Sequence, residues 1–189
     1  TSVRVQVVTS PLGYIPFLVG GLVALLGGAV VLKRYHTSLA GFEHLEQMMG
    51  GQIPRASSLL LLGDPGSGKT VLSYQLLWEE LEAGKQCALL SYDAFPEDVQ
   101  ARMQEFGWDI IPYLRKGRFK ILDCYSGLTG EGQGAIRDPS DLTELNIQVT
   151  SYIAKANGGA VTLILDSLTP IFNGVDPKQA INFIQTVGA

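Results

Sequence analysis

Apolar residues are arranged in two different ways along this chain. Residues 12–32, "LGYIPFLVGGLVALLGGAVVL", form one continuous apolar run, and no charged residue occurs between Arg4 and Lys33. From Ser58 onward, short apolar runs typical of buried strands alternate with segments in which apolar residues recur at helical spacing. This alternation predicts βαβ units, and therefore an α/β fold with a mostly parallel sheet and helices on both faces.

Boundary residues place the individual elements. Pro96 suits the first turn of a helix, and the glycines at 84 and 107 suit helix ends. The pattern predicts strands at about 58–62, 87–93, 118–125 and 160–166, and helices at about 69–84, 96–107, 138–159 and 176–187.

The apolar run at 12–32 has the length of a membrane span. As a helix it would extend ~30 Å, about the hydrocarbon thickness of a bilayer. The basic sequence "KRYH" follows directly, as is typical on the cytoplasmic side. A buried core helix rarely runs this far without a charge, and a signal peptide has a shorter apolar region and a cleavage site. We therefore predict one transmembrane helix at 12–32, with the N-terminus outside and the following residues in the cytoplasm.

The first residues, "TSVRVQVV", alternate valine with polar residues in the manner of a half-buried strand. A single strand is not stable alone. We therefore interpret residues 1–9 as the end of an extracytoplasmic β-domain, and residues 38–189 as a separate cytoplasmic domain.

The strand predicted at 58–62 leads into a phosphate-binding sequence. "GDPGSGKT" fits the P-loop pattern at every fixed position. Its glycines let backbone N–H groups surround a phosphate, and the following helix directs its N-terminal dipole at the anion. Lys69 is expected to reach the β- and γ-phosphates, and the Thr70 hydroxyl to bind Mg²⁺. The predicted nucleotide-binding residues are Gly63, Asp64, Pro65, Gly66, Ser67, Gly68, Lys69 and Thr70.

A second part of the site is expected at the end of the strand predicted at 160–166. "VTLILD" places Asp166 at the carboxyl end of a core strand, the edge at which open α/β sheets bind ligands. Asp166 is therefore predicted to hold Mg²⁺, directly or through water, opposite Thr70. ATP and Mg²⁺ are the expected cofactors.

Composition narrows the remaining chemistry. The net charge of −4 argues against a nucleic-acid-binding surface over the whole domain, and the one basic run, at 115–120, is interpreted as a solvated turn. Cys87 and Cys124 lie in apolar strand-like runs without metal-ligand spacing, so both are predicted to be buried free thiols.

From about Leu39 onward the sequence resembles KaiC-like ATPases of the RecA superfamily, close to the group called RAD55-type ATPases. The resemblance rests on "LAGFEHLEQMMGGQIPRASSLLLLGDPGSGKT", "EFGWD", "LDCYS", "DPSDLTELNI" and "ILDSLTPIF". The chain departs from the family pattern at Glu43, Gln52 and Ala56, where the family has an aspartate and two glycines. The resemblance implies a RecA-like core, ATP binding and hexameric rings with nucleotide between subunits.

The same resemblance bears on hydrolysis. Hydrolysing members of the family carry a Glu-Glu pair after the strand that follows the P-loop helix, and one glutamate activates the attacking water. The matching residues here are Asp93, which is one methylene shorter, and Ala94, which has no proton chemistry. A shift of about 1 Å in a water-orienting group can cost ~10²-fold in rate. Asp93 is thus the candidate catalytic residue, with a role in capping the turn before Pro96 as an equal alternative, and ATP binding is better supported than turnover.

Three functions fit these features. The favoured one is a membrane-anchored KaiC-like ATP-binding protein, a slow ATPase or ATP-dependent switch in signalling or regulation, that forms homo-oligomers. The second is a RAD55-type recombination accessory, against which the membrane segment and the acidic charge count. The third is an ATP-binding assembly component of a membrane machine.

The order of the elements predicts that the domain is C-terminally incomplete. In the RecA-like core that the resemblance implies, a later strand lies between the P-loop strand and the strand of Asp166. After Asp166 the pattern predicts only one helix before Ala189. We therefore expect the chain to be a fragment of a longer protein.

Overall fold

A four-stranded parallel sheet in the order β1-β4-β2-β3 forms the centre of the molecule. The computed structural model describes residues 3–5, 58–130, 136–156 and 160–188. Within these residues the strands are β1 (Val3–Val5), β2 (Gln86–Ser91), β3 (Phe119–Asp123) and β4 (Val161–Asp166). The predicted parallel sheet is therefore confirmed.

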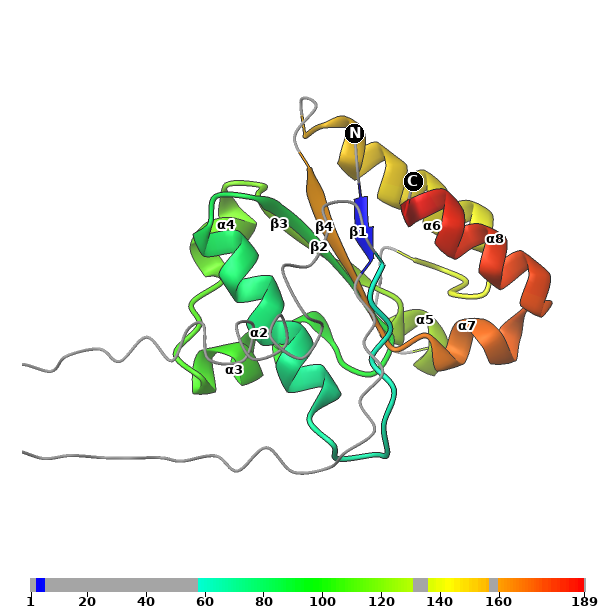
Figure 1. Ribbon diagram of the computed structural model, residues 1–189, viewed down its shortest axis with the longest axis horizontal. Coiled ribbons are helices and arrows are strands. Elements are labelled where there is room, and N and C mark those ends of the chain that lie inside the picture. The colour runs from blue at the N-terminus through cyan, green and yellow to red at the C-terminus, as the bar shows by residue number, and fades with distance from the viewer. Residues whose placement is uncertain (1–2, 6–57, 131–135, 157–159, 189) are drawn as a thin grey trace, which may run out of the picture.

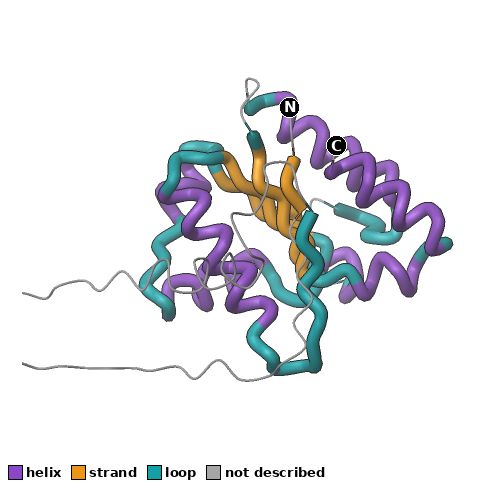
Figure 2. The backbone as a smooth tube through the Cα atoms, viewed as in Figure 1, coloured by secondary structure: helices purple, strands orange, loops and turns teal. Residues whose placement is uncertain are grey.

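Helices cover both faces of this sheet (Figures 1 and 2). One face carries α2 (Lys69–Glu82), α3 (Pro96–Glu105) and α4 (Ile111–Arg115), and the other carries α6 (Leu142–Ala154) and α8 (Pro177–Gly188), with α5 (Tyr125–Thr129) and α7 (Thr169–Gly174) beside them. Successive residues of β2 pack in two different hydrophobic clusters: Leu89 lies in the cluster on the α2 side of the sheet, and Leu90 in the cluster on the α6 side. Burial on both faces explains why the strands appear in the sequence as continuous apolar runs.

The four long helices lie close to where they were predicted, and the boundaries that differ include the end of β3 and the start of α6. β3 ends at Asp123 instead of continuing to 125, because the Asp123 carboxylate accepts bonds from the Ser126 N–H at 2.9 Å and the Ser126 hydroxyl at 2.5 Å, which turns the chain into α5. α6 begins at Leu142 and not near 138, because Asp141 caps it by accepting bonds from the N–H groups of its first turn.

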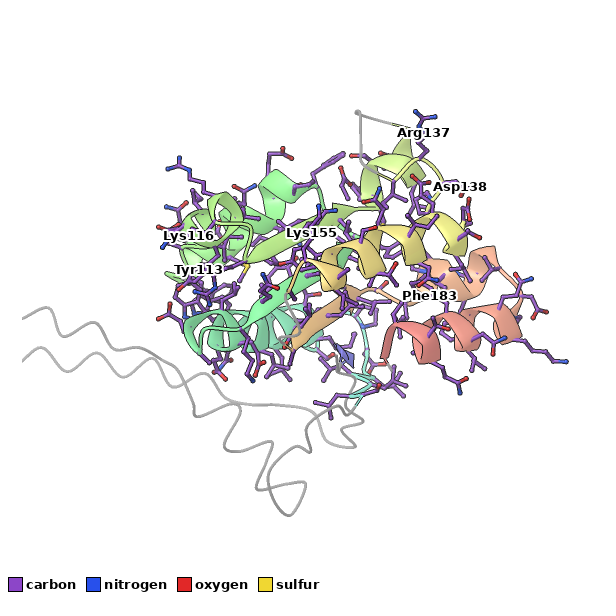
Figure 3. The ribbon with its side chains drawn as sticks, turned by 90° about the horizontal axis from the view of Figure 1, so that it is seen from above. Tyr113, Lys116, Arg137, Asp138, Lys155 and Phe183 are labelled. Atoms are coloured by element: carbon purple, nitrogen blue, oxygen red, sulfur yellow. The ribbon has the colours of Figure 1, made fainter. Side chains whose placement is uncertain are left out.

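The basic run at 115–120 forms the turn between α4 and β3. Arg115 and Lys116 are exposed, and Gly117 has a φ of +68°, in the left-handed region that favours glycine. Arg118 turns inward and donates to the carbonyls of Leu81 and Lys85 at 2.8 and 3.2 Å. Seen from above, Lys116 lies at the other end of the molecule from Asp138 (Figure 3). The interpretation as a solvated turn therefore holds for residues 115–117, whereas Arg118 turns inward and residues 119–120 already belong to β3.

The strand predicted at 58–62 is not formed as a regular strand. Only Leu62 makes a single bridge, and the side chains of Leu60 and Leu62 are 41% and 56% exposed. A strand is stable only against a neighbour with which it pairs along its length. The edge of β4 that faces away from β2 is paired with β1 instead.

β1 is a strand, as the alternation of valines predicted, but it lies in an unexpected place. Residues 3–5 pair in parallel with residues 161–163 of β4. This edge of β4 offers backbone groups that a strand can satisfy. That residues 1–9 end an extracytoplasmic domain stays a prediction, and in this structure residues 3–5 belong to the same sheet as β4. The membrane span predicted at 12–32 lies outside the described residues, and no helix within them is both long and apolar enough to cross a bilayer.

Candidate nucleotide-binding site

The loop between Leu62 and α2 takes a shape that depends on its glycines. Gly66 and Gly68 have φ of +79° and +87°, angles that side chains rarely adopt, and a Cβ at Gly63 would lie 2.7 Å from the Ser67 hydroxyl oxygen. α2 begins directly after Gly68, and in the described part of the chain no side chain caps its first turn. The N–H groups there could bind an anion, as those at phosphate-binding helix N-termini do.

Lys69 folds back over this loop. Its Nζ donates to the carbonyls of Gly63 and Asp64, each at 2.8 Å, and more weakly to the Ser67 hydroxyl at 3.3 Å. These acceptors are neutral, and a charged phosphate oxygen forms a stronger bond to an ammonium group. A nucleotide phosphate can therefore replace them, so the residues predicted at 63–70 form one loop arranged around Lys69.

Thr70 and Asp166 approach each other at the carboxyl edge of the sheet, although 96 positions separate them in the sequence. The Thr70 hydroxyl donates to Asp166 Oδ1 at 3.4 Å. Asp166 is the last residue of β4, is followed by a cis peptide bond to Ser167, and accepts a backbone bond from the Tyr92 N–H at 2.7 Å. Burial raises the pKa of the Asp166 carboxyl; the Thr70 hydrogen bond opposes this effect, and the charge of Asp93 adds to it.

The pair fits Mg²⁺. A hydroxyl and a carboxylate supply hard oxygen ligands, and Mg²⁺ in proteins commonly combines one or two such groups with nucleotide phosphates and water. A divalent cation would also favour the charged form of Asp166, which burial opposes. Within the described residues, no group of three or more His, Cys, Asp or Glu side chains is placed to hold a metal ion.

Asp93 follows the end of β2 and lies close to Asp166. Its side chain is exposed, and its charge acts on the Asp166 carboxyl. The turn before Pro96 is held by Ser91, whose hydroxyl donates to the Ala94 carbonyl at 2.6 Å, and no described side chain caps α3. The described hydrogen bonds therefore give no support to the capping role of Asp93. Ala94 is 3% exposed and serves the core.

Two further residues of this region were missed in the sequence. Tyr74 lies on α2, four residues after Thr70, and is 2% exposed. Burial, followed by the charge of Asp166, raises the pKa of Tyr74 to about 12, and the positive charge of Arg102 on α3 opposes this shift. The only signal for Tyr74 was its spacing of one helical turn from Thr70. Arg102 gave no signal, because arginine is common on exposed helix faces.

The prediction of buried free thiols is confirmed, because Cys87 and Cys124 are both buried and unpaired with each other. Burial raises the pKa of the Cys124 thiol to about 12 and that of the Cys87 thiol further. Neither thiol is ionised at neutral pH, so neither has the reactivity of a catalytic cysteine.

Known proteins resemble this chain over most of its length. A family model described as "ATPase: KaiC" matches residues 38–187. Similar curated proteins include the UPF0273 proteins of Thermotoga maritima (29% identical over 146 residues), Pyrococcus horikoshii (30% over 144) and Aeropyrum pernix (31% over 146). These alignments cover 75%, 74% and 75% of this chain, and 58%, 56% and 57% of the relatives. The chain thus spans somewhat more than half the length of these relatives.

The family match includes the P-loop, Asp93 and Asp166, and the parallel α/β sheet fits a RecA-like core. This chain therefore belongs to the KaiC family of RecA-superfamily P-loop ATPases.

Proposed function

We propose that this protein binds Mg·ATP and works as an ATP-dependent switch or a slow ATPase. The observation that carries the proposal is the 3.4 Å approach of Thr70 to Asp166 beside the loop that surrounds Lys69. Two segments far apart in the sequence meet where a P-loop protein needs a hydroxyl and a carboxylate for its metal ion.

Each group has one task in this proposal. The N–H groups of the loop and of the start of α2 bind the phosphates. Lys69 exchanges its carbonyl acceptors for phosphate oxygens, and Thr70 and Asp166 hold Mg²⁺. The bound cation neutralises part of the phosphate charge.

Whether the protein hydrolyses ATP or works only as a switch depends, in this proposal, on Asp93. It is an exposed carboxylate near Asp166, a suitable position for orienting a water. Its reach is one methylene shorter than that of glutamate, and the neighbouring Ala94 has no group that could assist. These two features support slow turnover and make ATP binding the better supported activity.

Calorimetry of the wild type and of Lys69→Ala tests the binding proposal. We expect Lys69→Ala to weaken Mg·ATP binding by at least about 10²-fold, because a charge-assisted contact to the phosphates is lost. Lys116→Ala removes the same charge from the exposed turn after α4 and should leave binding unchanged. Wild-type affinity in Lys69→Ala would show that the loop is not the nucleotide site.

Phosphate release from the same samples separates the two modes of action. Release that Asp93→Asn removes without weakening ATP binding would identify a slow ATPase with Asp93 as the catalytic residue. Binding by the wild type without release would identify a switch.

We further propose that residues 12–32 attach the protein to a membrane and that it acts in signalling or regulation as a homo-oligomer. The support comes from the apolar run, the basic "KRYH" that follows it, and the ring-forming family. A single pass with the N-terminus outside would require residues 3–5 to leave the sheet, in which they pair with β4.

A further inference from the structure

Glu80 is a charged residue in the buried face of α2, the helix that follows the P-loop. It is 7% exposed, and the adjacent buried positions of this face are taken by Leu77 and Leu81. A glutamate is almost never buried without a partner, because removing its charge from water is costly. Glu80 has two partners, and one of them belongs to the strand that carries Asp166.

The two partners fix the Glu80 carboxylate in place. The buried Thr162 hydroxyl of β4 donates to Glu80 Oε2 at 2.8 Å. Lys85 Nζ donates to Oε1 and Oε2 of the same carboxylate at 2.7 and 2.6 Å. Lys85 is itself positioned by the end of α2, where Gly84 has a φ of +86° and the Lys85 N–H donates to the Glu80 carbonyl at 3.0 Å. Thr162 is therefore the contact through which this group reaches the sheet.

The helix α2 is thus bonded to β4 near both of its ends. Thr70 meets Asp166 at 3.4 Å at one end, and Glu80 meets Thr162 at 2.8 Å at the other. Ten residues of helix between Thr70 and Glu80 extend ~15 Å, and four residues of strand between Thr162 and Asp166 extend ~13 Å. Because the two lengths are similar, the contact at one end restricts where α2 can lie at the other end.

We propose that Glu80 is a positioning residue of the Mg²⁺ site: through Thr162 it sets the register of α2 on β4 and so keeps Thr70 opposite Asp166. The inference rests on the proposed function. A buried ion pair adds little stability compared with well-packed apolar side chains, and its best-attested use is to select one register. An apolar side chain at position 80 would need only burial, whereas the Glu80 carboxylate needs the Thr162 hydroxyl.

The test compares ATP affinity in excess Mg²⁺ with ATP affinity in EDTA, using the full chain and calorimetry. The ratio of the two affinities measures how much the metal ion contributes to binding. Thr162→Val keeps the shape of the side chain and removes the hydroxyl, while Glu80 stays paired with Lys85. We expect this variant to lower the ratio about tenfold, because Mg²⁺ demands near-ideal ligand geometry and groups that orient its ligands typically matter 10–100-fold. The affinity in EDTA should be unchanged.

Two substitutions of Glu80 separate positioning from stability. Glu80→Met removes the acceptor and keeps the position apolar and filled, and the Lys85 side chain, 37% exposed, can still reach water. We expect its unfolding midpoint in urea to be unchanged or higher and its affinity ratio to fall about tenfold. Glu80→Gln keeps an oxygen that accepts from Thr162, so it should show the wild-type ratio. A residue that only stabilised the fold would give Glu80→Met a lower midpoint and a wild-type ratio.

Thr162→Ser and Tyr152→Phe are the matched controls. Thr162→Ser keeps the hydroxyl and should show the wild-type ratio. Tyr152→Phe removes another buried hydroxyl at the same level of the sheet, since it donates to the Cys87 carbonyl at 2.9 Å and Cys87 is opposite Thr162. Tyr152 lies on α6, which covers the other face, so this variant should also keep the wild-type ratio.

The outcomes separate this inference from the proposed function. A wild type without Mg²⁺-dependent ATP binding overturns both. A wild type that binds Mg·ATP, together with an unchanged ratio in Thr162→Val or Glu80→Met, overturns only the role of Glu80. A lowered ratio in Glu80→Gln, Thr162→Ser or Tyr152→Phe would show that the ratio does not report the Glu80–Thr162 contact, and would equally overturn that role.

Discussion

Asp166 is held in surroundings that suit a bound cation better than the free protein. Because burial raises the pKa of its carboxyl, the folded protein binds this proton more tightly than the unfolded chain does. Stability therefore falls as the pH rises from the unfolded pKa through the raised folded value, and above that value the loss is complete. Above that raised pKa, the metal-free protein carries a carboxylate that weakens its own fold.

Replacing Asp166 should consequently stabilise the free protein while damaging its function. We expect Asp166→Asn to raise the melting temperature without nucleotide at pH values above the raised pKa, by about 2–4 °C for each kcal/mol of relieved penalty. The Mg²⁺ contribution to ATP binding should be lost in the same variant. Melting followed by circular dichroism should show the gain shrinking as the pH falls through the raised pKa, where the wild-type carboxyl becomes neutral. A melting temperature that stays below that of the wild type at every pH would contradict this account.

Residues of the site differ in how far the sequence could predict them. Lys69 and Thr70 were predictable because a phosphate-binding loop needs fixed residues at fixed spacing. Asp166 was predictable from its place after an apolar strand. Tyr74 and Arg102 were not, because only the packing of α2 and α3 against the strands brings those common residue types to the end of β4.

At the scale of elements, α6 depends on a side-chain cap. Asp141 Oδ1 accepts bonds from the N–H groups of Thr143 and Glu144 at 2.8 and 3.2 Å, and so satisfies donors that a helix start leaves unpaired. α6 covers one face of the sheet and buries Leu145 and Val149. Loss of the cap should therefore weaken the packing of that face as well as the helix.

We expect Asp141→Ala to lower the free energy of unfolding by about 1 kcal/mol, the usual cost of losing such a cap. Asp141→Asn is the matched variant, because an asparagine side-chain oxygen accepts the same bonds. Chemical denaturation of the three proteins measures the difference. Equal stability of Asp141→Ala and the wild type would show that α6 does not depend on this cap.

The long helices and three core strands were predictable because their apolar periods extend over several turns or a whole buried run. The short helices α5 and α7 were missed, since five or six residues are too few to display a helical period. The segment 58–62 was predicted from its composition alone, which favours a strand. Whether a strand forms also depends on a pairing edge, and composition does not reveal one.

At the scale of the whole molecule, the pairing of β1 with β4 leads to a prediction about the proposed membrane attachment: the N-terminus should lie on the same side as the rest of the domain. With residues 3–5 in the sheet, a cysteine introduced as Ser2→Cys should not react with a membrane-impermeant maleimide in intact cells, and should react once the cells are opened. Native Cys87 and Cys124 are buried and should not contribute. Ser58→Cys, at an exposed residue of the domain, is the control that stays protected in either arrangement.

Labelling of the cysteine at position 2 in intact cells would place the N-terminus outside and contradict the pairing of β1 with β4 in the membrane-attached protein.

The order of the strands in the sheet could not be predicted from the sequence. Neighbours in a parallel sheet need not be neighbours in the sequence, and the apolar pattern of residues 3–5 does not indicate with which strand they pair.

The order of the strands in the sheet also determines when each pair of strands can form during folding. Cys87 pairs with Phe119, so β2 and β3 can join early, whereas β4 lies between β1 and β2 although it is synthesised last of the four. Val3 cannot pair until Val161 has been synthesised, and almost the whole length of the chain separates the two residues. Pairings this distant slow folding and leave strand edges open meanwhile. On a ribosome, the edge of β2 therefore stays unprotected until residues 161–166 emerge, and the docking of β4 is the step at which a nascent chain either completes its core or associates with a neighbour.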